Sequence, residues 1–168
     1  MRTQSFARLA VLVSAALMVT GCAADDADGH DGSTAPPLQL RLVTSTEAGA
    51  CTAPPLTADG PGTACDLEGT TTYELAESLG VVTPTAVTRD APAGAHAVGV
   101  EFDKADATTL KEVTSKAINE ELALLLNGKV LSAATVHDPI TTGTFIFGFG
   151  NASDADRAAA LLGASSTS

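Results

Sequence analysis

Apolar and polar residues alternate in several short segments of the chain, and this alternation predicts strands. It is clearest over residues 38–44 and 97–102. In a strand, alternate side chains share a face, so each segment would bury one face and expose the other. The buried faces would consist of Leu38, Leu40 and Leu42 in the first segment and of Val98, Val100 and Phe102 in the second.

The part of the chain between these two strands has weaker patterns. Residues 71–75 are consistent with a strand or extended segment, and residues 76–80 with a helical turn that Gly80 ends. Residues 81–92 are rich in turn-forming types and give no clear element.

After Phe102 the spacing of apolar residues changes. They no longer recur at every second position, as in a strand, but at the spacing of a helix. Asp103 is placed to cap the helix, with Asp106 three residues on. The buried stripe would consist of Leu110, Val113, Ala117 and Ile118. On the other face, Glu112, Lys116 and Glu120 have the i,i+4 spacing of ion pairs.

The C-terminal third predicts a hairpin, a strand and a second helix. Asn127-Gly128 separates two apolar runs, as in a tight hairpin turn. Farther on, Phe145, Phe147 and Phe149 would share one face of a strand, opposite Ile146 and Gly148. The last helix would open at Ser153, with Asp156 as its capping-box partner, and would stop at Gly163. Together these elements predict an α+β fold in which two helices pack on one face of an antiparallel sheet.

Residues 98–162 resemble the head subdomain in the large extracytoplasmic region of SecD, a membrane protein that assists protein export. The residues that carry the resemblance are Phe102-Asp103, the run Asn127–Ala133, Asp138-Pro139-Ile140 and Gly143. One departure is Ala134, which stands where the family pattern has proline after Ser-Ala. The resemblance implies the same α+β architecture and a role in holding emerging polypeptide. The helices that drive SecD are not part of this resemblance, so any export role would be that of an accessory.

The N-terminus predicts export and lipid attachment. Arg2 and Arg8 accompany an apolar run, Leu9–Val19, which is too short to span a bilayer and has the form of a secretory signal over residues 1–21. Val19-Thr20-Gly21-Cys22 resembles a lipobox, in which Cys22 would be diacylated and anchor the chain. The alternative is an ordinary signal peptide with an incidental cysteine.

Residues 22–37 are acidic and rich in glycine and proline, and they predict a flexible tether. Asp25–Asp31, which includes His30, contains metal-ligand types but lacks the spacing of a calcium loop, so a solvated spacer is the preferred interpretation. Residues 38–163 would then form a single domain, and residues 164–168 a disordered tail.

The charge of the chain argues against several classes of partner. The formal net charge is −11, and without Arg2 and Arg8 it becomes −13. A polyanion of this kind is repelled by nucleic acid and by anionic lipid headgroups. We therefore expect membrane contact through the lipid anchor only.

Cysteine usage agrees with an exported protein. If Cys22 is lipidated, Cys51 and Cys65 remain as one pair in an oxidising compartment, and a disulfide is the simplest interpretation. A redox-active pair is the alternative, although such pairs usually have Cys-x-x-Cys spacing.

Residue types used in catalysis occur, but not in a catalytic motif. Ser132, His137 and Asp138 are the types of a nucleophilic triad, and His96 adds a second imidazole. Adjacent His and Asp in a strand would point to opposite faces, which favours a structural role for all three. The sequence therefore predicts no enzyme, no cofactor and no metal site.

Taken together, these patterns predict a lipid-anchored, extracytoplasmic, non-enzymatic binding module. Its partners would be exported polypeptide or components of the Sec translocase. The alternative is a cell-envelope lipoprotein that uses the same fold to bind a small ligand or a surface partner.

Overall fold

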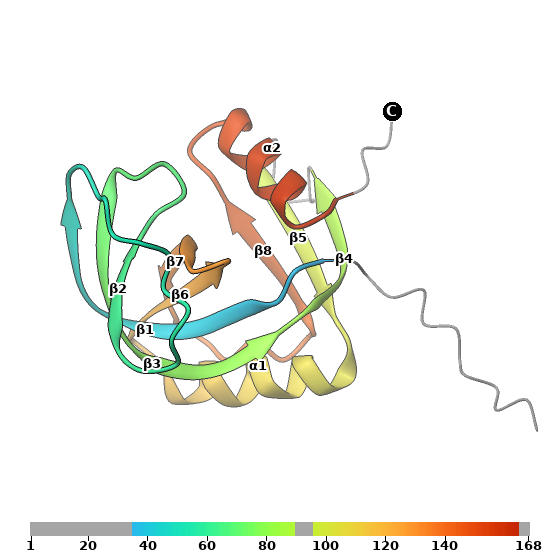
Figure 1. The fold of residues 1–168 in the computed structure, drawn as a ribbon. Coiled ribbons are helices and arrows are strands. Elements are labelled where there is room, and N and C mark those ends of the chain that lie inside the picture. The colour runs from blue at the N-terminus through green and yellow to red at the C-terminus, as the bar shows by residue number, and fades with distance from the viewer. Residues whose placement is uncertain (1–34, 90–95, 165–168) are drawn as a thin grey trace, which may run out of the picture. The chain divides into compact units, whose positions relative to one another are not determined.

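The computed structural model describes residues 35–89 and 96–164, which fold into strands and two helices around buried aliphatic side chains (Figure 1). The predicted signal peptide, Cys22 and the acidic tether lie outside the described residues, except for the tether's last three positions. All but the first residue of the predicted tail lies outside as well. The elements are β1 Leu38–Ala48, β2 Gly62–Cys65, β3 Thr71–Val82, β4 Pro84–Arg89, β5 Ala97–Phe102, α1 Lys104–Lys116, β6 Glu121–Leu126, β7 Lys129–Thr135, β8 Thr144–Gly148 and α2 Ala152–Leu161.

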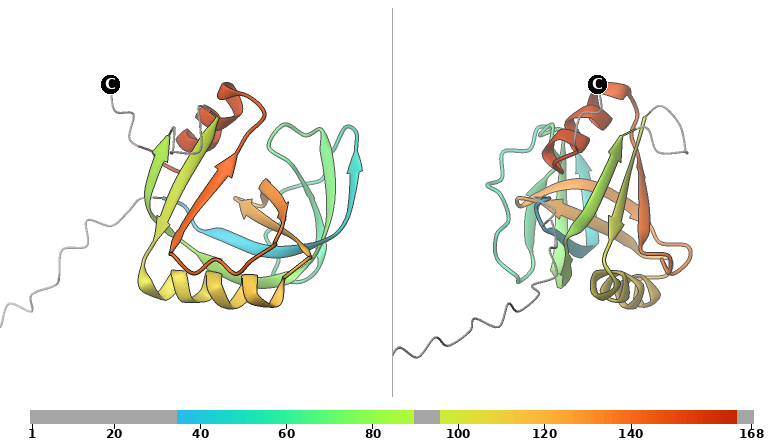
Figure 2. Two further views of the ribbon diagram at one scale, coloured as in Figure 1. Left: turned by 180° about the vertical axis from the view of Figure 1, so that it is seen from behind. Right: turned by 90° about the vertical axis from the view of Figure 1, so that its right-hand side faces the viewer.

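The strands form two antiparallel sheets, where a single sheet was predicted. The predicted α+β class is confirmed. The larger sheet has the order β2-β3-β1-β6-β7 and the smaller one β4-β5-β8. Figure 2 shows the two sheets from further directions, with α1 and α2 at opposite ends of the smaller one. Both helices contribute to one core, α1 through Leu110 and Val113 and α2 through Ala155 and Ala158.

The larger sheet curls until its two ends meet. An isolated parallel bridge joins Asp66, just after β2, to Val130 in β7. Because strand side chains alternate, this sheet has two buried faces. Leu122 and Leu124 belong to the main core shared with the helices and the smaller sheet, whereas Leu125 belongs to a second cluster inside the curl.

Arg41 holds the long connection between β1 and β2 against the curled sheet. Its side chain is fully buried and donates hydrogen bonds to the carbonyl oxygens of Ala58, Gly60 and Ala76. Burial lowers the pKa of the Arg41 guanidinium, and the nearby Asp59 carboxylate opposes this shift. The alternation over residues 38–44 gave no sign that an arginine would be one of the most buried side chains.

The predicted disulfide is present, and it closes the same connection. Cys51 and Cys65 are bonded, with their Cα atoms 5.6 Å apart. Within the loop that they close, the Leu56 amide donates to the Gly128 carbonyl at 2.9 Å. The disulfide loop therefore contacts the tip of the β6–β7 hairpin.

That hairpin matches the prediction in detail. Asn127 and Gly128 both have positive φ, at 51° and 77°, as the tight turn requires. The three phenylalanines after it also share a face as expected, and the ring centroids of Phe145 and Phe147 are 4.7 Å apart.

Each helix begins at a capping residue. The cap of α1 is the predicted one, and the cap of α2 lies earlier than predicted. Asp103 caps α1 by accepting from the Asp106 amide. The start of α2 was predicted wrongly, because Asn151, not Ser153, is the cap and accepts from the Asp154 amide at 3.0 Å. Asparagine is as good a cap as serine, so the cap lies two residues earlier than predicted. Gly163, with φ of 81°, ends the helix as predicted.

Two further expectations were wrong, and the turn-rich segment, for which no element was predicted, contains a strand. Residues 76–80 continue β3 instead of forming a helical turn, because they pair with β1 through register shifts that accommodate the extra residues. Part of the turn-rich segment forms β4 beside β5. Ile118 lies beyond the end of α1 and is 41% exposed.

Nor do Glu112, Lys116 and Glu120 form the ion pairs predicted for them, either with each other or with any other described residue. Glu120 lies beyond the end of α1, so it no longer continues the helical spacing. Within residues 35–89 and 96–164, neither helix has the length and apolar character needed to cross a bilayer.

Candidate functional site

An apolar cavity of about 200 Å³ opens between the two sheets. Its aliphatic and aromatic wall comes from α1, both sheets and the loop after β7, and includes Phe102, Leu110, Leu122, Leu124, Val136, Ile140 and Phe145. We call it the apolar cavity. Several of its wall residues, among them Leu110, Leu122 and Leu124, belong to the main core.

The pairing of β6 with β7 explains why the wall is apolar and why side chains do not fill the cavity. Leu122 pairs with Ala134, and Leu124 pairs with Ser132, so large residues of β6 lie beside small ones of β7 on the same face. The short side chains of Ser132 and Ala134 do not fill the gap toward Phe145 of the other sheet. The cavity is therefore lined by the leucines of β6 and bordered by the short side chains of β7.

Two strand edges border the apolar cavity. β7 pairs with β6 on one side, and on its other side its only bridge to the described residues is the one from Asp66 to Val130. β8 pairs with β5 and has no second strand partner in the described part of the chain. Ser132, Ala134 and Thr135 of β7 and Phe145 of β8 line the same cavity, so both open edges lie beside it.

The loop between these edges is held by a buried hydroxyl. Thr114 of α1 is fully buried, and its Oγ1 accepts a hydrogen bond from the Ile140 amide at 3.0 Å. Where the loop returns to the sheet, the Phe102 amide donates to the Gly143 carbonyl at 2.9 Å. These two contacts fix the position of Ile140 in the cavity wall.

The structure brings the predicted catalytic residue types together without connecting them. Ser132, His137 and Asp138 all line the apolar cavity, but no hydrogen bond joins any two of them. The expectation that His137 and Asp138 point to opposite faces was wrong, because both lie beyond the end of β7. His96 lies elsewhere, next to β5, where its carbonyl accepts from the Phe149 amide. A nucleophile needs a base within hydrogen-bond reach, which this arrangement does not provide.

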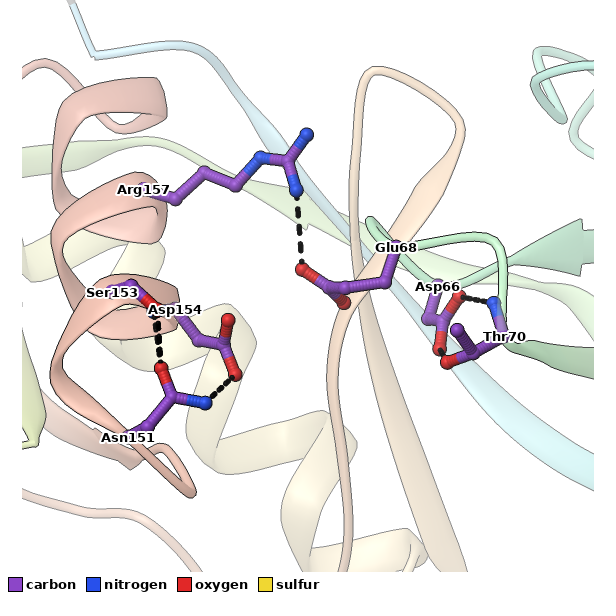
Figure 3. A network of polar contacts seen from close by, with 7 residues as sticks. All are labelled: Asp66, Glu68, Thr70, Asn151, Ser153, Asp154 and Arg157. Carbon is purple, nitrogen blue, oxygen red and sulfur yellow. Dashed lines mark hydrogen bonds and ion pairs between the residues drawn. The ribbon is translucent and has the colours of Figure 1, made fainter.

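A second cavity, also of about 200 Å³, lies near α2 and the tip of the β6–β7 hairpin. We call it the cationic cavity, because Lys129 and Arg157 both line it. Figure 3 shows Arg157 extending from α2 toward Glu68, and the two side chains form an ion pair of 3.5 Å. Leucines 67, 126 and 161 complete its apolar wall.

The turn that contains Glu68 is organised by Asp66. Its carboxylate accepts from the amide and the hydroxyl of Thr70, each at 2.7 Å (Figure 3). Burial by itself would raise the pKa of Asp66, but the hydrogen bonds from Thr70 and Thr71 outweigh it and lower the pKa. Sequence reasoning did not find this residue, because its partners become neighbours only through the turn.

Neither cavity offers the ligands of a metal site. Among residues 35–89 and 96–164, no group of three or more His, Cys, Asp or Glu side chains is positioned to hold a metal ion. The predicted metal-ligand types around His30 lie outside the described residues.

Comparison with known proteins identifies relatives of the region that forms the apolar cavity. The family model of the SecDF P1 head subdomain matches residues 79–167. The protein translocase subunit SecD of Acidaminococcus fermentans is 36% identical over 70 residues, which are 41% of this chain and 17% of that protein. The chain therefore matches about a sixth of the length of this curated relative.

Two solved structures are similar at lower identity. SecDF in a super-membrane-facing form is 22% identical, with a TM-score of 0.49, and the match covers 76% of this chain and 18% of that one. A second structure, of a membrane component SecDF that enhances protein export, is 16% identical with a TM-score of 0.41, and the match covers 77% of this chain and 63% of that one.

Proposed function

Because this chain belongs to the family of SecDF P1 head subdomains, we propose that it is a lipid-anchored, extracytoplasmic binding module that holds extended polypeptide during protein export. In this proposal it catalyses no reaction. The family relation supports the link to export, and the geometry of the apolar cavity supports the kind of ligand.

The observation that carries the proposal is the position of the apolar cavity between two open strand edges. An extended polypeptide can add to a sheet edge through main-chain hydrogen bonds, which accept any sequence. Its alternate side chains then point to one face. Beside β7, that face is the one that opens into the apolar cavity, so an aliphatic or aromatic side chain can enter it.

Peptide binding tests this directly. A fluorescent peptide of alternating leucine and serine should bind the purified full chain, and Ala134→Trp should raise its Kd at least tenfold by filling the cavity. Ala134 is exposed at the rim, so the fold should tolerate the change. Ala86→Trp is the matched control, because Ala86 is an exposed strand residue that lines neither cavity. Equal binding by all three proteins would reject the apolar cavity as the site.

The role in export needs a separate test in cells. We propose introducing a photo-crosslinking residue at Thr142, in the loop beside the apolar cavity, and identifying the captured proteins by mass spectrometry. Translocase components or unfolded exported chains are expected. Capture of folded envelope proteins alone would contradict the role in export while leaving peptide binding intact.

Lipid attachment at Cys22 is a further part of the proposal. Cys22→Ala should move the chain from the membrane fraction to the soluble fraction, because one diacylated cysteine supplies both anchoring chains. Mass spectrometry of the N-terminal peptide should show the two acyl groups on Cys22. An unmodified cysteine there would instead support the alternative of an ordinary signal peptide.

A second candidate function is an envelope lipoprotein that binds a small ligand. The observation that favours it is the cationic cavity, which combines charge and apolar surface. Both functions are compatible with one molecule, because the two cavities share no lining residue.

A further inference from the structure

The cationic cavity stands out because the rest of the chain is acidic. The chain has 20 acidic and nine basic residues, yet two basic side chains, Lys129 and Arg157, line this one space. We propose that the cationic cavity binds a carboxyl-terminal residue with an aliphatic side chain. This proposal does not rest on the function proposed above, because it uses a different cavity.

The charge at the cavity suits an anion with a single charge. Glu68 pairs with Arg157 at 3.5 Å, which leaves one net positive charge among Lys129, Arg157 and Glu68. The side chain of Lys129 forms no hydrogen bond or ion pair with any described residue. A carboxylate would match this balance, whereas a phosphate dianion would leave an uncompensated negative charge beside Glu68.

The remaining walls indicate what the carboxylate is attached to. Leu126 is buried at the base, while Leu161 is 41% exposed and Leu67 is half-buried, so the wall offers apolar surface to a ligand. Asn127 lines the same cavity and has both an amide donor and an acceptor. A terminal residue carries a carboxylate, an adjacent amide and a side chain, and these three groups match the cations, Asn127 and the leucines.

The cavity is held in shape before any ligand binds. The Leu56 amide donates to the Gly128 carbonyl at 2.9 Å, which fixes the hairpin tip between Asn127 and Lys129. A Cβ atom at Gly128 would lie only 2.6 Å from the Leu56 nitrogen, so the two segments are in close contact. The bridge from Asp66 to Val130 positions the turn that carries Leu67. A preformed site loses less entropy on binding.

We would test the proposal with N-acetyl-leucine as the probe and the purified full chain as the receptor. Amide shifts of Asn127, Gly128 and Lys129 in NMR spectra should report binding. N-acetyl-leucinamide, which has the same shape without the charge, should bind at least tenfold more weakly. Equal binding of the two compounds, or no shifts at these residues, would overturn the proposal.

Three variants test which charged side chains contribute to binding of the carboxylate. Lys129→Gln should weaken binding of N-acetyl-leucine about tenfold, while Lys111→Gln, an exposed lysine on α1, should leave it unchanged. Glu68→Gln should strengthen binding severalfold, because it releases the Arg157 guanidinium and raises the net charge. A weaker or unchanged affinity in Glu68→Gln would contradict the charge balance proposed here.

Octanoate distinguishes a free fatty acid from a chain terminus. It has the carboxylate and an aliphatic tail but lacks the amide that Asn127 would contact. We expect it to bind more weakly than N-acetyl-leucine. Tighter binding of octanoate would overturn the proposed ligand class, and neither result bears on peptide binding at the apolar cavity.

Discussion

The two sheets of this protein are built in different ways. The five-stranded sheet curls on itself, encloses its own apolar cluster and is tied across its ends by a bridge, a disulfide loop and the buried Arg41. The three-stranded sheet has no cluster of its own; α2 contacts its strands β4 and β5, whereas α1 contacts β5 and, more extensively, β3 of the larger sheet. Its strand β8 has an open edge beside the apolar cavity.

This difference separates stability from binding. Most of the polar cross-links described above start from β1, from the connection between β1 and β2 or from the turn after β2, and these segments precede the family match at residues 79–167. The open edges and the wall of the apolar cavity lie inside that match. We infer that the first part of the domain stabilises the larger sheet, on which the matched part builds its binding surface.

The largest effect is expected from removing Arg41. Arg41→Met should lower the free energy of unfolding by about 4 kcal/mol, because several buried carbonyl groups lose their donor at once. Denaturant unfolding would measure this. Arg157→Met is the control, since its exposed ion pair should contribute less than about 1 kcal/mol. A loss for Arg41→Met as small as that of the control would show that the buried arginine is not a main cross-link of the curled sheet.

The next largest effect is expected from the disulfide. Replacing Cys51 and Cys65 together by alanine should cost about 3 kcal/mol, because the closed loop restricts the unfolded chain. Hydrogen exchange at the hairpin tip should also accelerate, since Leu56 of that loop bonds Gly128.

Peptide binding at the apolar cavity should change little in the same double variant, which would sharpen the contrast between the two regions. Reducing agent should destabilise the wild-type chain and leave the double alanine variant unaffected. A matching loss of peptide affinity in the variant would show that the two regions are energetically coupled.

A smaller and pH-dependent effect is expected at Asp66. Its pKa in the folded state is lowered, so its stabilising contribution is complete above its unfolded pKa of about 3.9 and is lost as pH falls through the folded value. Asp66→Asn should cost about 1 kcal/mol at pH 7, and this difference should shrink on acidification below about pH 4.

Urea unfolding at pH 7 and at pH 3 would measure the change at Asp66. Asp138→Asn is the control, because Asp138 is exposed and makes no hydrogen bond to the described residues. A difference between Asp66→Asn and the wild type that stayed constant with pH would show that the carboxylate charge is not what stabilises the turn.

The sequence correctly predicted those elements that depend on only a few adjacent residues. Asn127-Gly128 specified its turn because both residues adopt positive φ easily, and Asp103 specified a helix start because its cap lies three residues away. The strand at residues 76–82 was missed because its pairing with β1 includes register shifts, which no local pattern shows. In such a segment, pairing with a neighbouring strand overrides the local secondary-structure propensity.

The candidate sites were only partly predictable for the same reason. The sequence singled out Ser132, His137 and Asp138, and the structure places all three at one cavity. It gave no sign that this cavity is mainly apolar, because the leucines of β6 and the aromatic residues of β5 and β8 meet only when the two sheets pack. Arg41 and Arg157 were missed because the carbonyl groups that Arg41 bonds and the carboxylate that pairs with Arg157 are 17 to 89 residues away in the sequence.

The sequence by itself determined the class of the fold, the hairpin, the first helix start and the cysteine pair, because each depends on short-range spacing or on a small number of available partners. Only the tertiary structure decided that the larger sheet curls, that the edges of β7 and β8 beside the apolar cavity remain open and that two cations meet at one cavity. These features depend on which distant segments pack together, and packing is set by the summed burial of many side chains.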